Sequence, residues 1–136
     1  MCGIAGLLTP RGLPAERDAL EAMVAAIGHR GPDQTGIIAC GSIGMAAARL
    51  SIVDPTAAGA QPFADEHAAL AFNGEIYNHR ELGLRLEAEG VSFRGRSDTE
   101  VLFHALHRWG VEETLPRLRG MFAFAYADLA RQTVSL

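Results

Sequence analysis

The sequence predicts a single domain of mixed α and β structure, because segments with strand character and segments with helix character follow one another along the chain. Its 136 residues suffice for one domain with a hydrophobic core, and 49% of them are hydrophobic against 21% charged, as in ordinary globular proteins. Apolar residues recur both at helical spacing and at period two. No internal repeat, low-complexity tract or linker divides the chain.

The N-terminal segments predict a strand, a loop and a helix. Residues 2–8 are apolar with glycines, as in a short strand, and Pro and Gly mark residues 9–14 as a loop. Apolar residues at i, i+3, i+4 and i+7 then predict a helix over residues 16–27, which Gly28 ends. Residues 29–33 follow as a turn, because Pro32 lacks an N–H and is incompatible with a continuing helix.

The middle of the chain predicts a hairpin, a loop and a further strand. Segments 36–40 and 42–50 form the hairpin around Gly41, and Cys40 is expected to be buried. The segment 55–62 has no periodicity and is expected to be a surface loop. Residues 70–72 predict a strand that ends in a turn at Asn73-Gly74, a dipeptide that tolerates positive φ.

The last part of the chain predicts three helices and a strand. Capping boxes at Asn78 and Ser97 begin helices that end near Gly90 and Gly110. A third helix is expected from near Thr114, so that Pro116 lies in its first turn. Large and small apolar residues alternate over residues 121–127, which predicts a strand buried on both faces.

Charge and composition exclude several classes of partner. The formal net charge of −4 gives no basic surface for nucleic acid or an anionic membrane. No stretch reaches the roughly 18 apolar residues of a membrane helix, and no signal peptide pattern occurs. With only two cysteines in the chain, we expect a reducing, cytoplasmic compartment.

Cys2 directly follows the initiator methionine. Removal of Met1 would give Cys2 a free α-amino group, which could accept the proton of its own thiol. Nucleophile and base would then share one residue, the N-terminal variant of an activated nucleophile. A cysteine at position 2 is by itself more often an accident of translation, so the hypothesis depends on the rest of the chain.

Seven ordered blocks resemble the N-terminal glutaminase domain of glutamine-hydrolysing asparagine synthetases, a class II, N-terminal-nucleophile glutamine amidotransferase. The resemblance spans nearly the whole chain. The blocks are MCGIAG at 1–6, HRGPD at 29–33, ARLSIVD at 48–54, GAQPF at 59–63, FNGEIYNHREL at 72–82, SDTEV at 97–101 and GMFAFAYAD at 120–128. The resemblance implies an α+β fold, a four-layer αββα sandwich of two mainly antiparallel sheets, which the predicted elements fit but would not select unaided.

The resemblance also implies hydrolysis of the glutamine side-chain amide through a thioester on Cys2. Asn73 and Gly74 would form the oxyanion hole through a side-chain amide and a backbone N–H. Arg49 would hold the substrate α-carboxylate with its planar guanidinium, and Asp98 would receive the α-ammonium. The remaining substrate-binding residues that the resemblance implies are Leu50, Ser51, Ile52, Val53 and Glu75.

Simpler interpretations exist for each of these residues. Arg49 alone could form a structural ion pair, Asp98 could compensate a helix dipole, and Asn73-Gly74 could be a plain turn. His29, Arg30 and Asp33 fit a turn that braces the site. Glu100, His104 and His107 lie on neighbouring helical turns, but they lack a fourth zinc ligand and are expected to form a solvated face, so no metal site is expected.

The resemblance implies partners that lie outside these residues. Ammonia would pass to an ATP- and Mg²⁺-dependent synthetase domain on the same longer chain, while residues 1–136 need no cofactor of their own. We therefore expect a truncated domain, incomplete at its C-terminus, whose natural protein continues; a homodimer is left open. Other hypotheses are a different carboxylate acceptor, an amidase for another amide, and a non-catalytic glutamine-sensing or assembly module.

Overall fold

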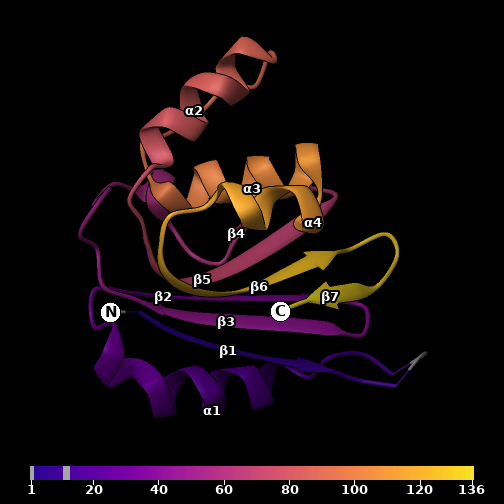
Figure 1. Ribbon diagram of the computed structural model, residues 1–136. Helices are drawn as coiled ribbons and strands as arrows, with labels where there is room; N and C mark the ends of the chain where they lie inside the picture. Colours follow the sequence, from indigo (N-terminus) through magenta and orange to yellow (C-terminus); the bar gives the residue numbers. More distant parts are fainter. Residues whose placement is uncertain (1, 11–12) are drawn as a thin grey trace.

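The structure, a computed structural model, describes residues 2–10 and 13–136. Its strands and helices form four layers, with helices on both outer sides of two stacked sheets (Figure 1). The elements in chain order are β1 (Gly3–Leu8), α1 (Arg17–Ile27), β2 (Gln34–Cys40), β3 (Ile43–Arg49), β4 (Phe63–Ala64), β5 (Ala68–Ile76), α2 (His79–Ala88), α3 (Asp98–Trp109), α4 (Val111–Thr114), β6 (Gly120–Asp128) and β7 (Thr133–Ser135).

The strands form two antiparallel sheets, with the orders β1-β3-β2 and β4-β5-β6-β7. Helix α1 covers the outer face of the first sheet, and α2, α3 and α4 lie beyond the second (Figure 1). The predicted α+β, four-layer αββα architecture is therefore confirmed. Periodicities in the sequence alone do not reveal this architecture, because the pairing of β1 with β3 and of β5 with β6 joins segments far apart in sequence.

The first sheet has one face against α1 and one face against the second sheet. Leu20 and Val24 of α1 pack against the small Ala46 and Ala48 of β3, so the predicted amphipathic helix is confirmed. The hairpin around Gly41 is also confirmed, since β2 and β3 pair closely and Gly41 has φ of 58°. Cys40 is exposed at the end of this hairpin, so the prediction that it is buried is wrong.

The two sheets meet through residues at alternate positions of their strands. Ile43 and Met45 of β3 are packed with Ala69 of β5 and Ala127 of β6. Side chains of successive strand residues point to opposite faces, so Leu70 and Phe72 point the other way, toward the helices. Short alanine side chains on the facing surfaces allow the two sheets to approach closely.

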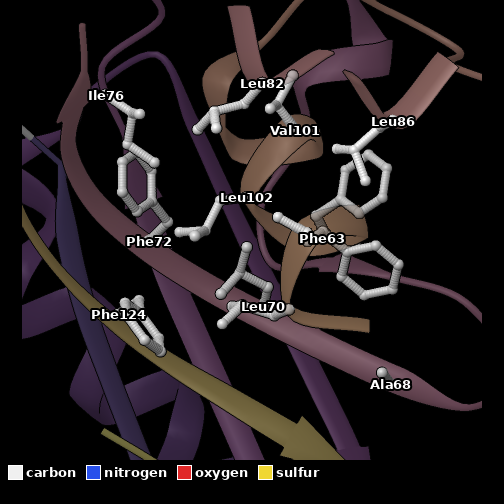
Figure 2. Packing of buried hydrophobic residues seen from close by; sticks show 13 residues of the cluster. Phe63, Ala68, Leu70, Phe72, Ile76, Leu82, Leu86, Val101, Leu102 and Phe124 are labelled. Carbon is white, nitrogen blue, oxygen red and sulfur yellow. The ribbon is translucent and has the colours of Figure 1, made fainter. Parts of the chain in front are cut away.

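The main core lies between the second sheet and helix α3 (Figure 2). Phe72 and Leu70 of β5 pack there with Leu102 of α3 and Phe63 of β4 (Figure 2). The predicted start of α3 is confirmed, because the Ser97 hydroxyl accepts a hydrogen bond from Glu100 N–H at 3.1 Å. Burial of aromatic and leucine side chains on this scale supplies most of the favourable free energy of folding.

Three local predictions are wrong in part. The Asn78 side chain does not cap α2 but bonds to Arg117 C=O and Arg119 N–H, at 2.9 Å each. The helical turn expected from Thr114 begins earlier, at Val111, and is followed by a 3₁₀ turn at Leu115–Arg117. Residues 55–62 include a 3₁₀ turn at Ala57–Gly59 as well as buried positions.

Strand β6 pairs with β5 along its whole length and with β7 only at Tyr126–Asp128. The eight residues after Asp128 thus form one short strand, as predicted. Burial on both faces is not confirmed for the start of β6, because Met121 is 67% exposed. No helix within residues 2–10 and 13–136 combines the length and the apolar character that crossing a membrane requires.

Candidate active site

A pocket of about 120 Å³ opens where the start of the chain, the segment after β3, the end of β5 and the start of α3 come together. One water needs only about 10–15 Å³ of such space, so the pocket has room for a small organic molecule. Most of the predicted site residues line it. These are Cys2, Arg49, Leu50, Ile52, Val53, Gly74, Glu75 and Asp98, whereas Ser51 and Asn73 do not line it.

Cys2 immediately precedes β1 and is half-buried at the pocket. Its Sγ lies 3.4 Å from Leu50 N and 3.8 Å from Leu50 C=O. Arg30 Nε donates to the Cys2 carbonyl at 3.1 Å, which agrees with a bracing function for the 29–33 turn. Met1, whose removal the hypothesis requires, lies outside the described residues.

The Arg49 guanidinium is buried and already makes contacts within the protein. It donates to the backbone carbonyls of Asp54 and Thr56, the latter at 3.4 Å, and to Gln34 Oε1 at 3.5 Å. Arg49 therefore holds the segment 50–56, which forms one wall of the pocket. A substrate carboxylate would have to share the guanidinium with these carbonyls, a requirement that the sequence did not reveal.

The segment after Arg49 is fixed from a second side. Asp33 Oδ2 accepts a hydrogen bond from Ser51 N–H at 2.7 Å. Ile52 and Val53 follow at the rim of the pocket, where they are 74% and 39% exposed. Backbone groups of this segment are thus held in place while its two apolar side chains remain open to solvent.

Asn73 and Gly74 lie within β5, so the predicted turn at this dipeptide is wrong. They pair with Ala123 and Phe122 of β6. Gly74 has φ of 151°, and a Cβ there would collide with the backbone of Met121 and Phe122. Glycine is therefore required at this position for close approach of two strands rather than for a turn.

Strand geometry directs the Gly74 N–H into the pocket. Alternate residues of an antiparallel strand point their N–H groups to the same edge. The N–H groups of Phe72 and Ile76 bond to the side chains of Gln61 and Asp98, at 2.8 and 3.0 Å, rather than to β6. Gly74 lies midway between them, so its N–H points to the same edge, where Gly74 lines the pocket.

Asn73 carries an unusual polar atom. Among the buried side-chain nitrogen and oxygen atoms of the described residues, only Asn73 Oδ1 has no hydrogen-bond partner. Such atoms are rare in folded proteins and cost free energy when left unpaired. A side chain kept at this position despite that cost is more consistent with a functional role than with packing.

Asp98 is one of three acidic residues that line the pocket, with Asp54 and Glu75, and it is 4% exposed at the first position of α3. Its carboxylate accepts hydrogen bonds from Ile76 N–H at 3.0 Å and Thr99 N–H at 2.9 Å. Burial raises the pKa of Asp98, while these N–H groups and nearby His79 oppose the shift. A cationic group bound beside Asp98 would favour its charged form.

Other pocket residues were not singled out as site residues from the sequence. Asp54 and Gln61 are buried polar residues, 7% and 4% exposed, in segments without periodicity. The only sequence signal for these two residues was that Asp54 lies in the block ARLSIVD and Gln61 in the block GAQPF. The remaining lining residues are Phe72, Ser97, Thr99 and Met121.

The Glu100, His104 and His107 group is not a solvated face, because Glu100 is fully buried. Its carboxylate accepts hydrogen bonds from Arg94 N–H at 2.6 Å and Gly95 N–H at 2.8 Å. Glu100 thus fixes the loop before α3. Within the part of the chain that the structure describes, no three His, Cys, Asp or Glu residues are grouped to hold a metal ion.

Two antiparallel sheets with helices on both outer sides, and a cysteine directly before the first strand, are the features of an amidotransferase of the N-terminal-nucleophile class. The family model for the glutamine amidotransferase domain matches residues 1–136. The chain belongs to this glutamine amidotransferase domain family.

Curated relatives and solved structures agree with this assignment. The glutamine-hydrolysing asparagine synthetase 1 of Bacillus subtilis is 43% identical over 91% of this chain, and a rice (Oryza sativa subsp. japonica) asparagine synthetase is 40% identical over 94%. The chain spans only 20% and 22% of those proteins. The glutamine phosphoribosylpyrophosphate amidotransferase of B. subtilis aligns with a TM-score of 0.55 and 28% identity, covering 65% of this chain and 22% of its own.

Proposed function

We propose that this domain hydrolyses the side-chain amide of L-glutamine and supplies ammonia to an asparagine synthetase-type amidation. The observation that carries the proposal is the meeting of Cys2, Gly74 and Asp98 at one pocket, from three separate parts of the chain. A thiol, a backbone N–H and a buried carboxylate are the groups needed to attack an amide, stabilise its oxyanion and bind an α-ammonium.

The reaction proceeds in two stages. After removal of Met1, the α-amino group of Cys2 takes the thiol proton, and the thiolate attacks the amide carbon. The oxyanion receives hydrogen bonds from Gly74 N–H and the Asn73 amide, and the α-amino group returns a proton to the departing ammonia. Water then attacks the γ-glutamyl thioester, which releases glutamate and restores the Cys2 thiol.

Substrate recognition uses both ends of the amino acid. Asp98 binds the α-ammonium together with Gly74 and Glu75, and Arg49 shares its guanidinium with the α-carboxylate. Backbone groups of Leu50, Ser51, Ile52 and Val53 complete the binding wall. Because Arg49 also holds this wall through Asp54 and Thr56, substrate binding and wall geometry are coupled.

The length of the matched relatives suggests which kind of domain uses the ammonia. Matched relatives are named as glutamine-hydrolysing asparagine synthetases and are about five times longer than the aligned region. We propose an ATP- and Mg²⁺-dependent synthetase domain on the same chain as the partner, with no cofactor in the glutaminase domain itself.

The test compares substrates on protein whose N-terminus has been checked by mass spectrometry. Ammonia release is measured with L-glutamine, with N-acetyl-glutamine and with glutamine α-amide. The proposal predicts hydrolysis of L-glutamine and strong loss with both blocked compounds, because each removes one charged end. Equal rates for all three would contradict recognition of a free amino acid.

A further inference from the structure

Gln61 makes an unusual pair of contacts for a residue in an irregular segment. Its side chain is 4% exposed, and its Oε1 accepts a hydrogen bond from Phe72 N–H at 2.8 Å. Its Nε2 donates to Thr99 Oγ1 at 3.4 Å. Phe72 directly precedes Asn73 in β5, and Thr99 directly follows Asp98 in α3. One side chain therefore links the two elements that carry the oxyanion donors and the ammonium-binding carboxylate.

Sheet topology explains why β5 needs this contact. Strand β4 pairs only with Ala69 and Leu70 of β5, so the same edge of β5 has no strand partner at Phe72. The Gln61 side chain takes the place of the missing strand there, and the Asp98 carboxylate does the same at Ile76. Gly74 N–H lies between these two fixed points and is left facing the pocket.

The backbone of Gln61 is itself held against the other sheet. A Cβ on Gly36 of β2 would collide with the Gln61 carbonyl, so the two backbones are in close contact. Gln61 consequently touches β2 through its backbone and β5 and α3 through its side chain. A buried amide that is bonded through both its oxygen and its nitrogen gives rigidity and a defined spacing.

We propose that Gln61 is a positioning residue, which sets the spacing and orientation of the oxyanion strand relative to the ammonium-binding start of α3. This inference rests on the proposed glutaminase function. Gln61 acts through Phe72 and Thr99 and does not itself take part in bond making. Its loss should therefore affect turnover of correctly folded protein and not only the amount of folded protein.

The primary test is Gln61→Met, which keeps an unbranched side chain of similar length and removes both hydrogen bonds. Active sites are counted by covalent labelling of Cys2 with 6-diazo-5-oxo-norleucine, so that kcat refers to folded protein. We expect kcat per labelled site to fall by about ten- to a hundredfold, as for a small misplacement of catalytic groups. Unchanged kcat and KM per site would overturn the proposal.

A second variant covers the case in which Gln61→Met does not fold. Thr99→Val removes only the hydroxyl that Gln61 Nε2 contacts and leaves the Phe72 bond in place. It should raise KM about two- to tenfold, the equivalent of one neutral hydrogen bond, with a smaller loss of kcat. Wild-type values for KM and kcat would show that the link to α3 has no function.

Gln132→Met is the matched control. Gln132 also uses both ends of its amide, accepting from Ser42 N–H at 2.7 Å and donating to Leu129 C=O at 2.7 Å, and it does not line the pocket. The control should lower Tm without changing kcat or KM per site. If Gln132→Met lost as much kcat as Gln61→Met, the loss in Gln61→Met would be explained by general destabilisation.

Amide hydrogen exchange separates this inference from the proposed function. Failure of the wild type to hydrolyse glutamine would refute the function, and the kinetic variants would then have no reference. In either case Gln61→Met should speed exchange at Phe72, whose N–H loses its acceptor, relative to Gln132→Met. An exchange rate at Phe72 equal to that of the wild type would overturn the positioning claim by itself.

Discussion

Asn73 combines a polar side chain with a half-buried place in a paired strand, where an apolar residue would be more favourable for stability. Its Oδ1 lacks a hydrogen-bond partner, and an unpaired buried polar atom costs about 1–3 kcal/mol. Truncation should therefore not destabilise the fold through this atom. The same residue is assigned as an oxyanion donor, so activity and stability should respond in opposite directions.

Asn73→Ala should lower kcat for glutamine by about 10²–10³, the usual cost of one oxyanion-hole donor. Its Tm should equal or exceed that of the wild type, because the unpaired oxygen is removed. Steady-state kinetics and calorimetry on the same preparation provide both values. A large fall in Tm with kcat retained would mean that Asn73 serves the fold and not the reaction.

Arg49→Lys tests the other end of the substrate. A lysine ammonium keeps the charge but cannot contact a carboxylate and two backbone carbonyls with one planar group. We expect KM for glutamine to rise roughly tenfold, equivalent to loss of one charge-assisted hydrogen bond, with a smaller fall in kcat. A selective loss of kcat with unchanged KM would contradict the assignment of Arg49 to ground-state binding.

Asp54 connects two loops of the pocket, the one after β3 and the one before α3. Its carboxylate accepts hydrogen bonds from Thr56 N–H and Oγ1, at 3.0 and 2.6 Å, and from Arg96 N–H at 3.0 Å. The hydrogen bonds from Arg96 and Thr56, and the nearby charge of Arg49, lower the pKa of Asp54 below its usual 3.8. The ionised form therefore stabilises the fold.

Asp54→Asn should be less stable than the wild type at pH 7. An Asn side chain has only one oxygen, so its NH2 group would face either the Arg96 N–H or the Thr56 donors, and the remaining hydrogen bonds would no longer be strengthened by a charge. A lowered pKa gives stability that is present above the unfolded value and lost as pH falls through the folded value. The difference in unfolding free energy between the two proteins should thus shrink below about pH 3.8. Urea titrations at pH 7, 5 and 3 measure it; a difference that grew toward low pH would contradict this account.

Local sequence signals predicted elements better than they predicted the roles of individual dipeptides. The α1 stripe and the Ser97 cap were predictable because helix contacts are near in sequence. Asn73-Gly74 was not, because pairing with β6 overrides the turn preference of the dipeptide. Asn78 similarly uses its side chain for Arg117 and Arg119 instead of capping α2, a long-range contact that no local pattern encodes.

On the scale of the molecule, the site depends on the stacking of the two sheets. Cys2 precedes β1 of the first sheet, whereas Asn73 and Gly74 belong to β5 of the second. Their alignment is therefore fixed by the contact layer of Ile43, Met45, Ala69 and Ala127. The resemblance predicted candidate site residues, most of which line the pocket, but the sequence could not predict that Arg49 already bonds to the pocket wall or that Gln61 completes the edge of β5.

The most direct test of the account is covalent labelling of the intact chain by 6-diazo-5-oxo-norleucine, followed by mass spectrometry of the N-terminal peptide. We expect that Met1 is absent, that Cys2 carries the label, and that glutamine protects against labelling. Exposed Cys40 provides an internal control, since it should remain unlabelled. Glutamine hydrolysis that continues while Met1 is retained, or while Cys2 is replaced by Ala, would contradict the central claim.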